Sequence, residues 1–198
     1  SKFPIRPAVI SIPIAAAATA FPTGSTFSCV KFVMNNESRR FPILRIAARE
    51  DIPQIAQIEK ECFGDNAWSE RAFFDYFDND TSLCLALFED ERLVGYICTY
   101  CLCGECEIVN VAVSSLYRRR GYGRELLSAV IERAKSEKIT KLLLEVRTSN
   151  TAARSLYESL GFYTVGVRKN YYTDPKEDAV LMDLSLSQNR NEGEETDS

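Results

Sequence analysis

A run of arginines and glycines between an expected strand and an expected helix combines residue types that bind anions. The run reads Arg118-Arg119-Arg120-Gly121-Tyr122-Gly123-Arg124. Residues 108–113 before it are mostly β-branched and apolar, and residues 126–134 after it repeat apolar side chains at helical spacing. Glycines let a ligand approach the backbone, the first N–H groups of a helix are free, and arginines add charge-assisted hydrogen bonds. The run therefore predicts a site for a small anion.

The spacing within this run excludes two common anion sites. It does not end in the Lys-Ser/Thr pair of a nucleoside-triphosphate loop, and it is not the G-x-G-x-x-G of a dinucleotide site. It does match R-x-x-G-x-G, through Arg118, Gly121 and Gly123. From these residues alone, a basic loop that only caps a helix remains an equal alternative.

A carboxylate and a phenol follow in the next strand and helix. Every second residue from 142 to 146 is apolar and shares one face of an expected strand over 141–147, so Glu145 points to the other face. A carboxylate in an apolar strand is costly unless it is paired or used, and a salt bridge to Arg147 or another basic side chain is the structural alternative. Tyr157 lies at the edge of a helical apolar stripe, where packing is the alternative to catalysis.

The expected elements place these groups in a mixed α/β layer structure. Helices are predicted over 52–62, from Ser69 through Phe77, from the arginine–glycine run to about Lys138, and over 152–160, with Asp51 and Ser69 as caps and Gly161 as a stop. Strands are predicted over 44–47, 83–88, 92–102, 107–113, 141–147, 162–167 and 179–184. The strands ending at Val113 and Arg147 should be parallel neighbours, and ligands bind beyond the carboxyl ends of such strands.

Composition narrows the class of protein further. The 198 residues are 45% hydrophobic, which is enough for one well-buried domain, and the net charge of −4 argues against non-specific binding to nucleic acid. No apolar stretch is long enough for a membrane span. The chain has no histidine, so no imidazole serves as a base or as a metal ligand.

The seven cysteines include the spacing C-x-x-C-x-C-x-x-C at Cys98, Cys101, Cys103 and Cys106. A single residue separates the two pairs, far less than the usual gap between the halves of a zinc site. The segment also reads as a strand, a turn at Gly104 and a second strand. We therefore expect small buried or hairpin thiols without a metal, in a reducing compartment.

The chain divides into an extension over 1–40, a domain over 41–186 and a polar acidic tail over 187–198. Residues 1–36 contain no acidic residue and hold four of the seven prolines. They read as an organellar transit segment, as a secretory-like signal, or as sequence upstream of a start at Met34. We expect both ends to be disordered, with the first also open to processing.

The R-x-x-G-x-G run resembles the pyrophosphate loop of the GNAT N-acetyltransferase superfamily. The strings LEVRTSNTAARSLYESLGF, RKNYY and DAVLMDL, in order within residues 44–184, resemble the bacterial ribosomal-protein alanine N-acetyltransferases of that superfamily. The resemblance implies the GNAT fold, a central mixed sheet with helices on both faces. It also implies direct transfer of an acetyl group from acetyl-CoA to an amine.

The resemblance assigns roles residue by residue. Glu145 occupies the general-base position and Tyr157 the general-acid position, while Asn150 matches an asparagine that contacts the cofactor. The backbone of Val111, Ala112 and Val113 is expected to pair with the pantetheine arm of acetyl-CoA, and Arg118 through Arg124 are expected to bind its pyrophosphate. No metal is implied.

The resemblance also implies a protein acceptor, the N-terminal alanine of a ribosomal protein. Lysine side chains, small amines, or acetyl-CoA binding without turnover are the alternatives. We expect a monomer or weak dimer in the cytoplasm, or in an organelle stroma or matrix if residues 1–36 are a transit segment. The cysteine-rich hairpin at 98–106 departs from the family pattern near the expected acceptor groove, whose peptide preference we expect to depend on a loop over 170–175.

Overall fold

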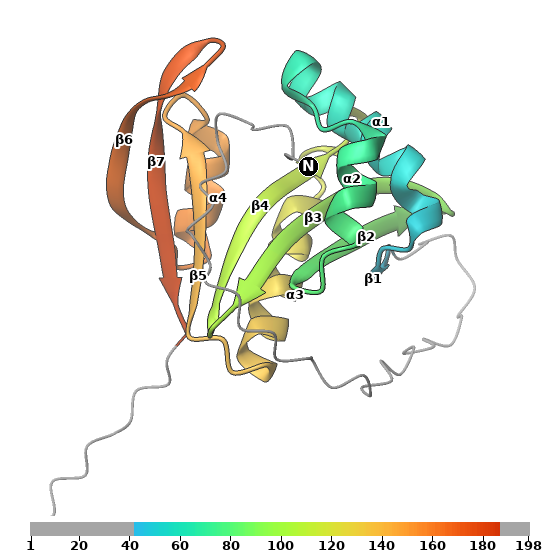
Figure 1. Cartoon of the computed structure of the whole chain (residues 1–198), viewed down its shortest axis with the longest axis horizontal. Coiled ribbons are helices and arrows are strands. Elements are labelled where there is room, and N and C mark those ends of the chain that lie inside the picture. Colours follow the sequence, from blue (N-terminus) through green and yellow to red (C-terminus); the bar gives the residue numbers. More distant parts are fainter. Residues whose placement is uncertain (1–41, 187–198) are drawn as a thin grey trace, which may run out of the picture.

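The computed structural model describes residues 42–186, so the expectations for residues 1–40 and 187–198 lie outside the described residues. Within this range the chain forms four α-helices, three short 3₁₀ turns and one mixed sheet of seven strands (Figure 1). The strands are β1 (Ile43–Ile46), β2 (Ser82–Glu89), β3 (Arg92–Leu102), β4 (Glu105–Val113), β5 (Lys141–Arg147), β6 (Tyr163–Thr173) and β7 (Lys176–Ser185). The helices are α1 (Ile52–Phe63), α2 (Glu70–Phe77), α3 (Tyr122–Ser136) and α4 (Thr151–Ser159), and the turns are η1 (Arg49–Asp51), η2 (Gly64–Asn66) and η3 (Ser115–Tyr117).

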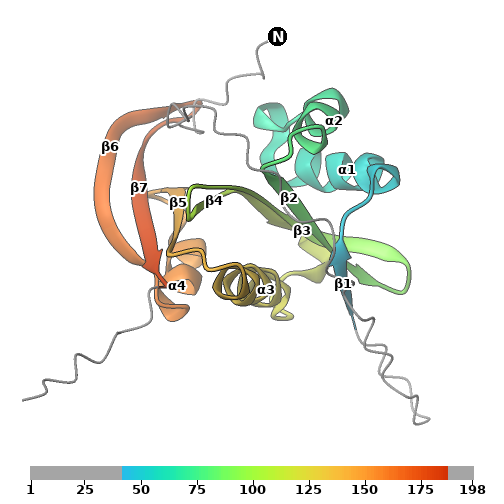
Figure 2. The ribbon, with the colours of Figure 1, turned by 60° about the horizontal axis from the view of Figure 1, so that its bottom comes forward.

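The helices lie on both faces of the sheet, whose strand order is β1-β2-β3-β4-β5-β7-β6 (Figure 2). One apolar core joins α3 to the sheet and includes the buried residues Leu126, Leu142 and Leu144. A second core joins α1 and α2 to β2 and β3. This arrangement confirms the expected mixed α/β class. None of the helices in residues 42–186 combines the length and apolar character that crossing a membrane requires.

The parallel pair of strands, β4 and β5, is joined over only part of its length. Pairing runs from Glu105 opposite Lys141 to Ile108 opposite Leu144 and then stops. Both strands continue past this point and move apart (Figure 1). The register between β3 and β4 also shifts here, where Thr99 pairs with Ile108 and Cys98 with Asn110. The bulge turns β4 away from β5. Beyond Ile108 the edge of β4 that faces β5 is therefore unpaired.

A buried carboxyl group holds the outer half of β4 to α1. Glu59 of α1 is 0% exposed and accepts hydrogen bonds from the Asn110 side-chain amide at 3.2 Å and the Trp68 backbone N–H at 2.9 Å. The Tyr96 hydroxyl of β3 also donates to it. Asn110 comes directly after the bulge, so these bonds attach β4 to α1 where it leaves β5.

Helix caps confirm two local expectations and correct a third. Ser69 caps α2, because its hydroxyl accepts from the Ala72 N–H at 3.2 Å, and Gly161 follows α4 with a φ of +94°. Asp51 precedes α1 but its carboxylate does not cap that helix. It accepts instead from both terminal nitrogens of Arg45 at 2.7 and 2.8 Å and from the Ala48 N–H. The carboxylate is thus turned toward Arg45 and the backbone before it, away from the first turn of α1.

The last hairpin is longer than expected. Strands predicted over 162–167 and 179–184 extend to Thr173 and back from Lys176, so the turn is Asp174-Pro175 rather than a loop over 170–175. Register shifts between Thr164 and Gly166 and between Arg168 and Tyr172 interrupt the alternation. A strand with bulges loses the period of two on which the sequence prediction depended.

The cysteine hairpin differs from the expectation of free thiols. Cys101 and Cys106 are direct partners across β3 and β4, with Cα atoms 4.0 Å apart, and form a disulfide. Antiparallel pairing brings them together, which the linear spacing does not reveal. Cys98 stays a buried thiol beside Cys84, and Cys103 at the turn is exposed.

We predict that Glu59→Ala lowers the free energy of unfolding by about 3 kcal/mol, because it leaves several buried donors without an acceptor. Glu59→Gln keeps one acceptor oxygen and should lose less. Chemical denaturation measures both, with exposed Glu158→Ala as the control. A loss in Glu59→Ala no larger than in the control would show that the buried network contributes little.

Candidate active site

The open edge of β4 presents backbone N–H groups toward the gap between β4 and β5. The Ser114 N–H donates to the Val94 carbonyl of β3 at 2.9 Å. Because N–H groups alternate along a strand, the Ala112 N–H also faces β3, while those of Val111 and Val113 face the gap. Of the three residues predicted to pair with a cofactor arm, two therefore have donors on the open side.

The arginine–glycine run forms a cradle of backbone donors at the start of α3. Arg119 and Gly121 have φ values of +65° and +89°, which turn successive N–H groups toward one side. No N–H of residues 119–124 donates to another described residue, whereas the Glu125 N–H donates to the Gly121 carbonyl at 3.0 Å. Free N–H groups at a helix start suit an anion such as a pyrophosphate.

The arginine side chains of this run divide between holding the loop and facing solvent. Arg118 donates to the Val113 carbonyl at 3.1 Å and to the Cys62 sulfur at 3.3 Å. Arg120 pairs with Glu89, and Arg124 donates to the Ser159 hydroxyl at 2.8 Å. Among the described residues, only the Arg119 side chain of this run has neither an ion pair nor a hydrogen bond.

Tyr122 and Gly123 serve the packing of α3 rather than contributing charge. The Tyr122 side chain is buried in the core beneath α3, and its hydroxyl lies near Arg120 and Glu89. A Cβ at Gly123 would lie 3.4 Å from a methyl group of Leu156 in α4. The glycine thus lets the first turn of α3 lie close to the helix that carries Tyr157.

Glu145 lies on the face of β5 opposite α3, as predicted, and its side chain is 9% exposed. Its Oε1 atom forms an ion pair with Arg168 of β6 at 3.1 Å, with a geometry outside that of a hydrogen bond. Arg147, its neighbour on the same face, pairs instead with Glu177 at 3.3 Å. The other oxygen, Oε2, is buried without a hydrogen-bond partner in residues 42–186.

The surroundings of Glu145 favour a carboxyl group that can accept a proton. Burial raises the pKa of Glu145, while the nearby Tyr171 hydroxyl and the Arg168 guanidinium oppose that rise. A carboxyl with a raised pKa is a better base than an exposed one.

A second carboxyl on this face was missed by sequence reasoning. Glu107 pairs in register with Leu143, so it shares the face of Glu145 at the last joined part of β4 and β5. Burial and the charge of Glu145 raise the pKa of Glu107 to about 7. The buried neighbours Cys106 and Ile108 were the available signal, because a residue between them must face the other side.

Tyr157 and Asn150 lie at the two ends of the α4 region. Tyr157 is 7% exposed, and its ring centroid is 5.9 Å from that of Phe162. Burial, with a contribution from Tyr172, raises its pKa above the usual range of tyrosine. The Asn150 side-chain oxygen caps α4 by accepting from the Ala153 N–H at 3.2 Å, which leaves its amide N–H groups for a ligand.

We predict that Glu107 gives the folded chain a specific pH dependence. Its folded pKa of about 7 exceeds the ordinary value of 4.5, so the folded state binds this proton more tightly than the unfolded chain. The stability from Glu107 is therefore full below pH 4.5 and is lost as the pH rises through 7. Denaturation of Glu107→Gln across this window should lack that decline, with Glu158→Gln as control. Identical pH profiles for wild type and Glu107→Gln would contradict the shift.

Comparison with known proteins identifies the family. The model of the acetyltransferase (GNAT) family matches residues 52–162. Separately, residues 42–186 contain no group of three or more acidic, cysteine or histidine side chains placed to hold a metal ion. The [ribosomal protein bS18]-alanine N-acetyltransferase of Salmonella typhimurium is 38% identical over 146 residues, spanning 73% of this chain and 97% of that protein. The protein of the same name from Escherichia coli is 37% identical over 139 residues, which are 69% of this chain and 93% of its own.

Solved structures agree with these relatives. The crystal structure of the ribosomal-protein-S18-alanine N-acetyltransferase from Escherichia coli has a TM-score of 0.71 and 33% identity, covering 77% of this chain and 98% of that one. Ard1 from Thermoplasma volcanium shares the fold, with a TM-score of 0.68 at 23% identity over 74% of this chain and 99% of its own. The resemblance expected from the sequence is confirmed, and the chain belongs to the GNAT acetyltransferase family.

Proposed function

We propose that this chain transfers an acetyl group from acetyl-CoA to the N-terminal α-amino group of a protein, and that the acceptor is a ribosomal protein beginning with alanine. The observation that carries the proposal is the open edge of β4, which has a donor cradle at its end and Glu145 on the neighbouring strand. Relatives that this chain spans almost completely are named for alanine acetylation of ribosomal protein bS18, which supports the acceptor class.

The residues present fit acetyl-CoA at this edge. Bound there, acetyl-CoA supplies an activated acetyl thioester. The free N–H groups of residues 119–124 suit its pyrophosphate. The N–H groups of Val111 and Val113 face the gap between the strands, where they can bind the pantetheine arm and polarise a carbonyl oxygen.

Glu145 is assigned the task of taking the proton from the acceptor amine. An α-amino group titrates near 7.7–8.0, so roughly a quarter is neutral at pH 7.4, against about one in a thousand for a lysine near 10.4. An α-amine therefore needs only modest help. A partly buried carboxyl with a raised pKa provides it, directly or through one water.

Tyr157 is assigned a hydrogen bond to the departing sulfur rather than complete proton transfer. From reference values of about 10 for tyrosine and 8.5 for a thiol, full transfer is uphill by roughly 2 kcal/mol. Burial raises the pKa of Tyr157 further, which makes full transfer harder still. A buried hydroxyl that keeps its proton can still stabilise developing negative charge.

We predict that the chain releases coenzyme A in the presence of acetyl-CoA and a peptide that begins with alanine. A matched peptide with a blocked N-terminus and an internal lysine should react at least about a hundredfold more slowly, as the lower neutral fraction of lysine requires. Thiol release measures the rate and mass spectrometry locates the acetyl group. Reaction on the blocked peptide alone would overturn the proposed acceptor.

We predict that Tyr157→Phe lowers kcat by about tenfold to a hundredfold while changing KM for acetyl-CoA less than kcat. The hydroxyl acts on charge that develops during the reaction, so its loss affects turnover more than binding. Steady-state kinetics with both substrates varied measures this. The catalytic assignment fails if only KM for acetyl-CoA rises, and Glu158→Gln on the same helix is the control.

A further inference from the structure

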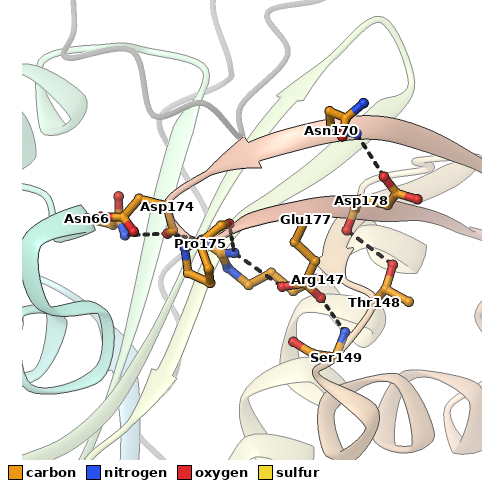
Figure 3. A network of polar contacts seen from close by, with 9 residues as sticks. All are labelled: Asn66, Arg147, Thr148, Ser149, Asn170, Asp174, Pro175, Glu177 and Asp178. Atoms are coloured by element: carbon orange, nitrogen blue, oxygen red, sulfur yellow. Dashed lines mark hydrogen bonds and ion pairs between the residues drawn. The ribbon is translucent and has the colours of Figure 1, made fainter.

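Arg147 ends β5, two residues after Glu145 and on the same face, and it makes contacts that no assigned role uses. Its Nη2 atom donates to the Asp174 carbonyl at 2.9 Å, and Nη1 donates to the Pro175 carbonyl at 3.1 Å. Nη1 also pairs with Glu177 at 3.3 Å. Figure 3 shows the guanidinium reaching the turn between β6 and β7 from the end of β5.

The guanidinium also packs on an aromatic ring of the same hairpin. Its central carbon lies 4.0 Å from the centroid of Tyr172. Such stacking adds to the charged hydrogen bonds and orients the plane of the arginine. Tyr172 is one of the groups that raise the pKa of Tyr157, so the stacked ring lies in the electrostatic surroundings of that residue.

The turn that Arg147 holds is attached at two further places. The Asn66 side-chain amide of η2 donates to the Asp174 carbonyl at 3.2 Å (Figure 3). Glu177 accepts from the Ser149 N–H at 2.5 Å, and the Asp178 carbonyl accepts from Thr148. The turn therefore connects the α1–α2 segment with the start of α4, and Arg147 lies between these attachments.

The acceptor side of the site is bounded by these same segments. The face of β5 that carries Leu142 and Leu144 is covered by α3, so an acceptor must reach Glu145 from the opposite face. The β6–β7 hairpin continues the sheet beside β5, with β7 paired to β5, and β6 carries Arg168 and Tyr171, the two groups that act on Glu145. Displacement of the hairpin would therefore move the surface that an acceptor meets beside Glu145.

We propose that Arg147 is a positioning residue for the acceptor, holding the β6–β7 turn and Tyr172 against the end of β5 so that the hairpin forms a fixed wall beside Glu145. The inference rests on the proposed function for the identity of the acceptor. Arg147 takes no part in proton transfer. Its side chain is only 27% exposed. Charge-assisted hydrogen bonds to two turn carbonyls and stacking on Tyr172 keep the hairpin in one place.

The test compares Arg147→Met with wild type as full chains, using the alanine peptide and acetyl-CoA. We expect KM for the peptide to rise about tenfold, with KM for acetyl-CoA within about twofold and kcat within about threefold. Arg147→Lys keeps the charge but loses the paired hydrogen bonds and the stacking on Tyr172, so its peptide KM should lie between those of wild type and Arg147→Met. Asn66→Ala, which removes one attachment without a charge, should raise the peptide KM less.

Arg45 provides a matched control. It also pairs with a carboxylate, Asp51, and its guanidinium lies 4.3 Å from the ring centroid of Phe88, but it lies on β1 at the edge of the sheet. Arg45→Met should leave the peptide KM unchanged. The proposal is overturned if Arg147→Met leaves the peptide KM unchanged, raises both KM values equally, or matches Arg45→Met.

Hydrogen exchange separates this inference from the proposed function. Arg147→Met should accelerate amide exchange over residues 172–178 by about tenfold, without peptide or acetyl-CoA present. If wild type acetylates no terminal amine but this acceleration occurs, the proposed function fails while the structural role of Arg147 stands. Unchanged exchange in this segment overturns the positioning role whatever the activity.

Discussion

The structure depends on one interruption of backbone pairing, the end of the β4–β5 ladder after Ile108 and Leu144. An unpaired strand edge inside a sheet leaves N–H and C=O groups that would otherwise bond to each other, so it must be held open by stronger contacts elsewhere. On one side, Glu59 binds Asn110 and draws β4 toward α1. On the other, β5 pairs with β7 from Lys141 to Arg147. The gap between β4 and β5 thus results from the attachment of β4 to α1 and of β5 to β7.

The same interruption sets the electrostatics of the site. Glu107 on β4 and Glu145 on β5 share a face beside the end of the joined ladder, and Arg168 acts on both carboxyl groups. Burial raises the pKa of both groups, and the charge of Glu145 adds to the rise at Glu107, so the Arg168 guanidinium offsets only part of each shift. Arg168 lies opposite Ala179 of β7, which in turn pairs with Arg147 of β5, so strand pairing places Arg168 beside Glu145. The side-chain contacts of Arg147 concern the turn beyond this paired part.

Features set by neighbouring residues could be predicted from the sequence, whereas features set by strand pairing could not. The cradle before α3, the Ser69 cap and the alternation around Glu145 depend on neighbouring residues, so their geometry follows from spacing. Glu107 and Arg168 become neighbours of Glu145 only through register, and β6 contains bulges that hide its period. Asp51 was assigned to the nearest helix because the competing partner, Arg45, lies on a separate strand. The disulfide likewise depends on pairing across β3 and β4.

Under the proposed function, a terminal amine suits this site better than a lysine. Arg168 and Tyr171 limit the rise of the Glu145 pKa, and burial keeps Tyr157 protonated. The pKa of an α-amine is about 2.5 units below that of lysine, so its neutral fraction at neutral pH is more than a hundredfold larger. It therefore needs less help in losing a proton before it attacks. For such an acceptor the proposed mechanism depends more on placing the amine than on proton transfer, and placement is the task proposed for the β6–β7 turn that Arg147 holds.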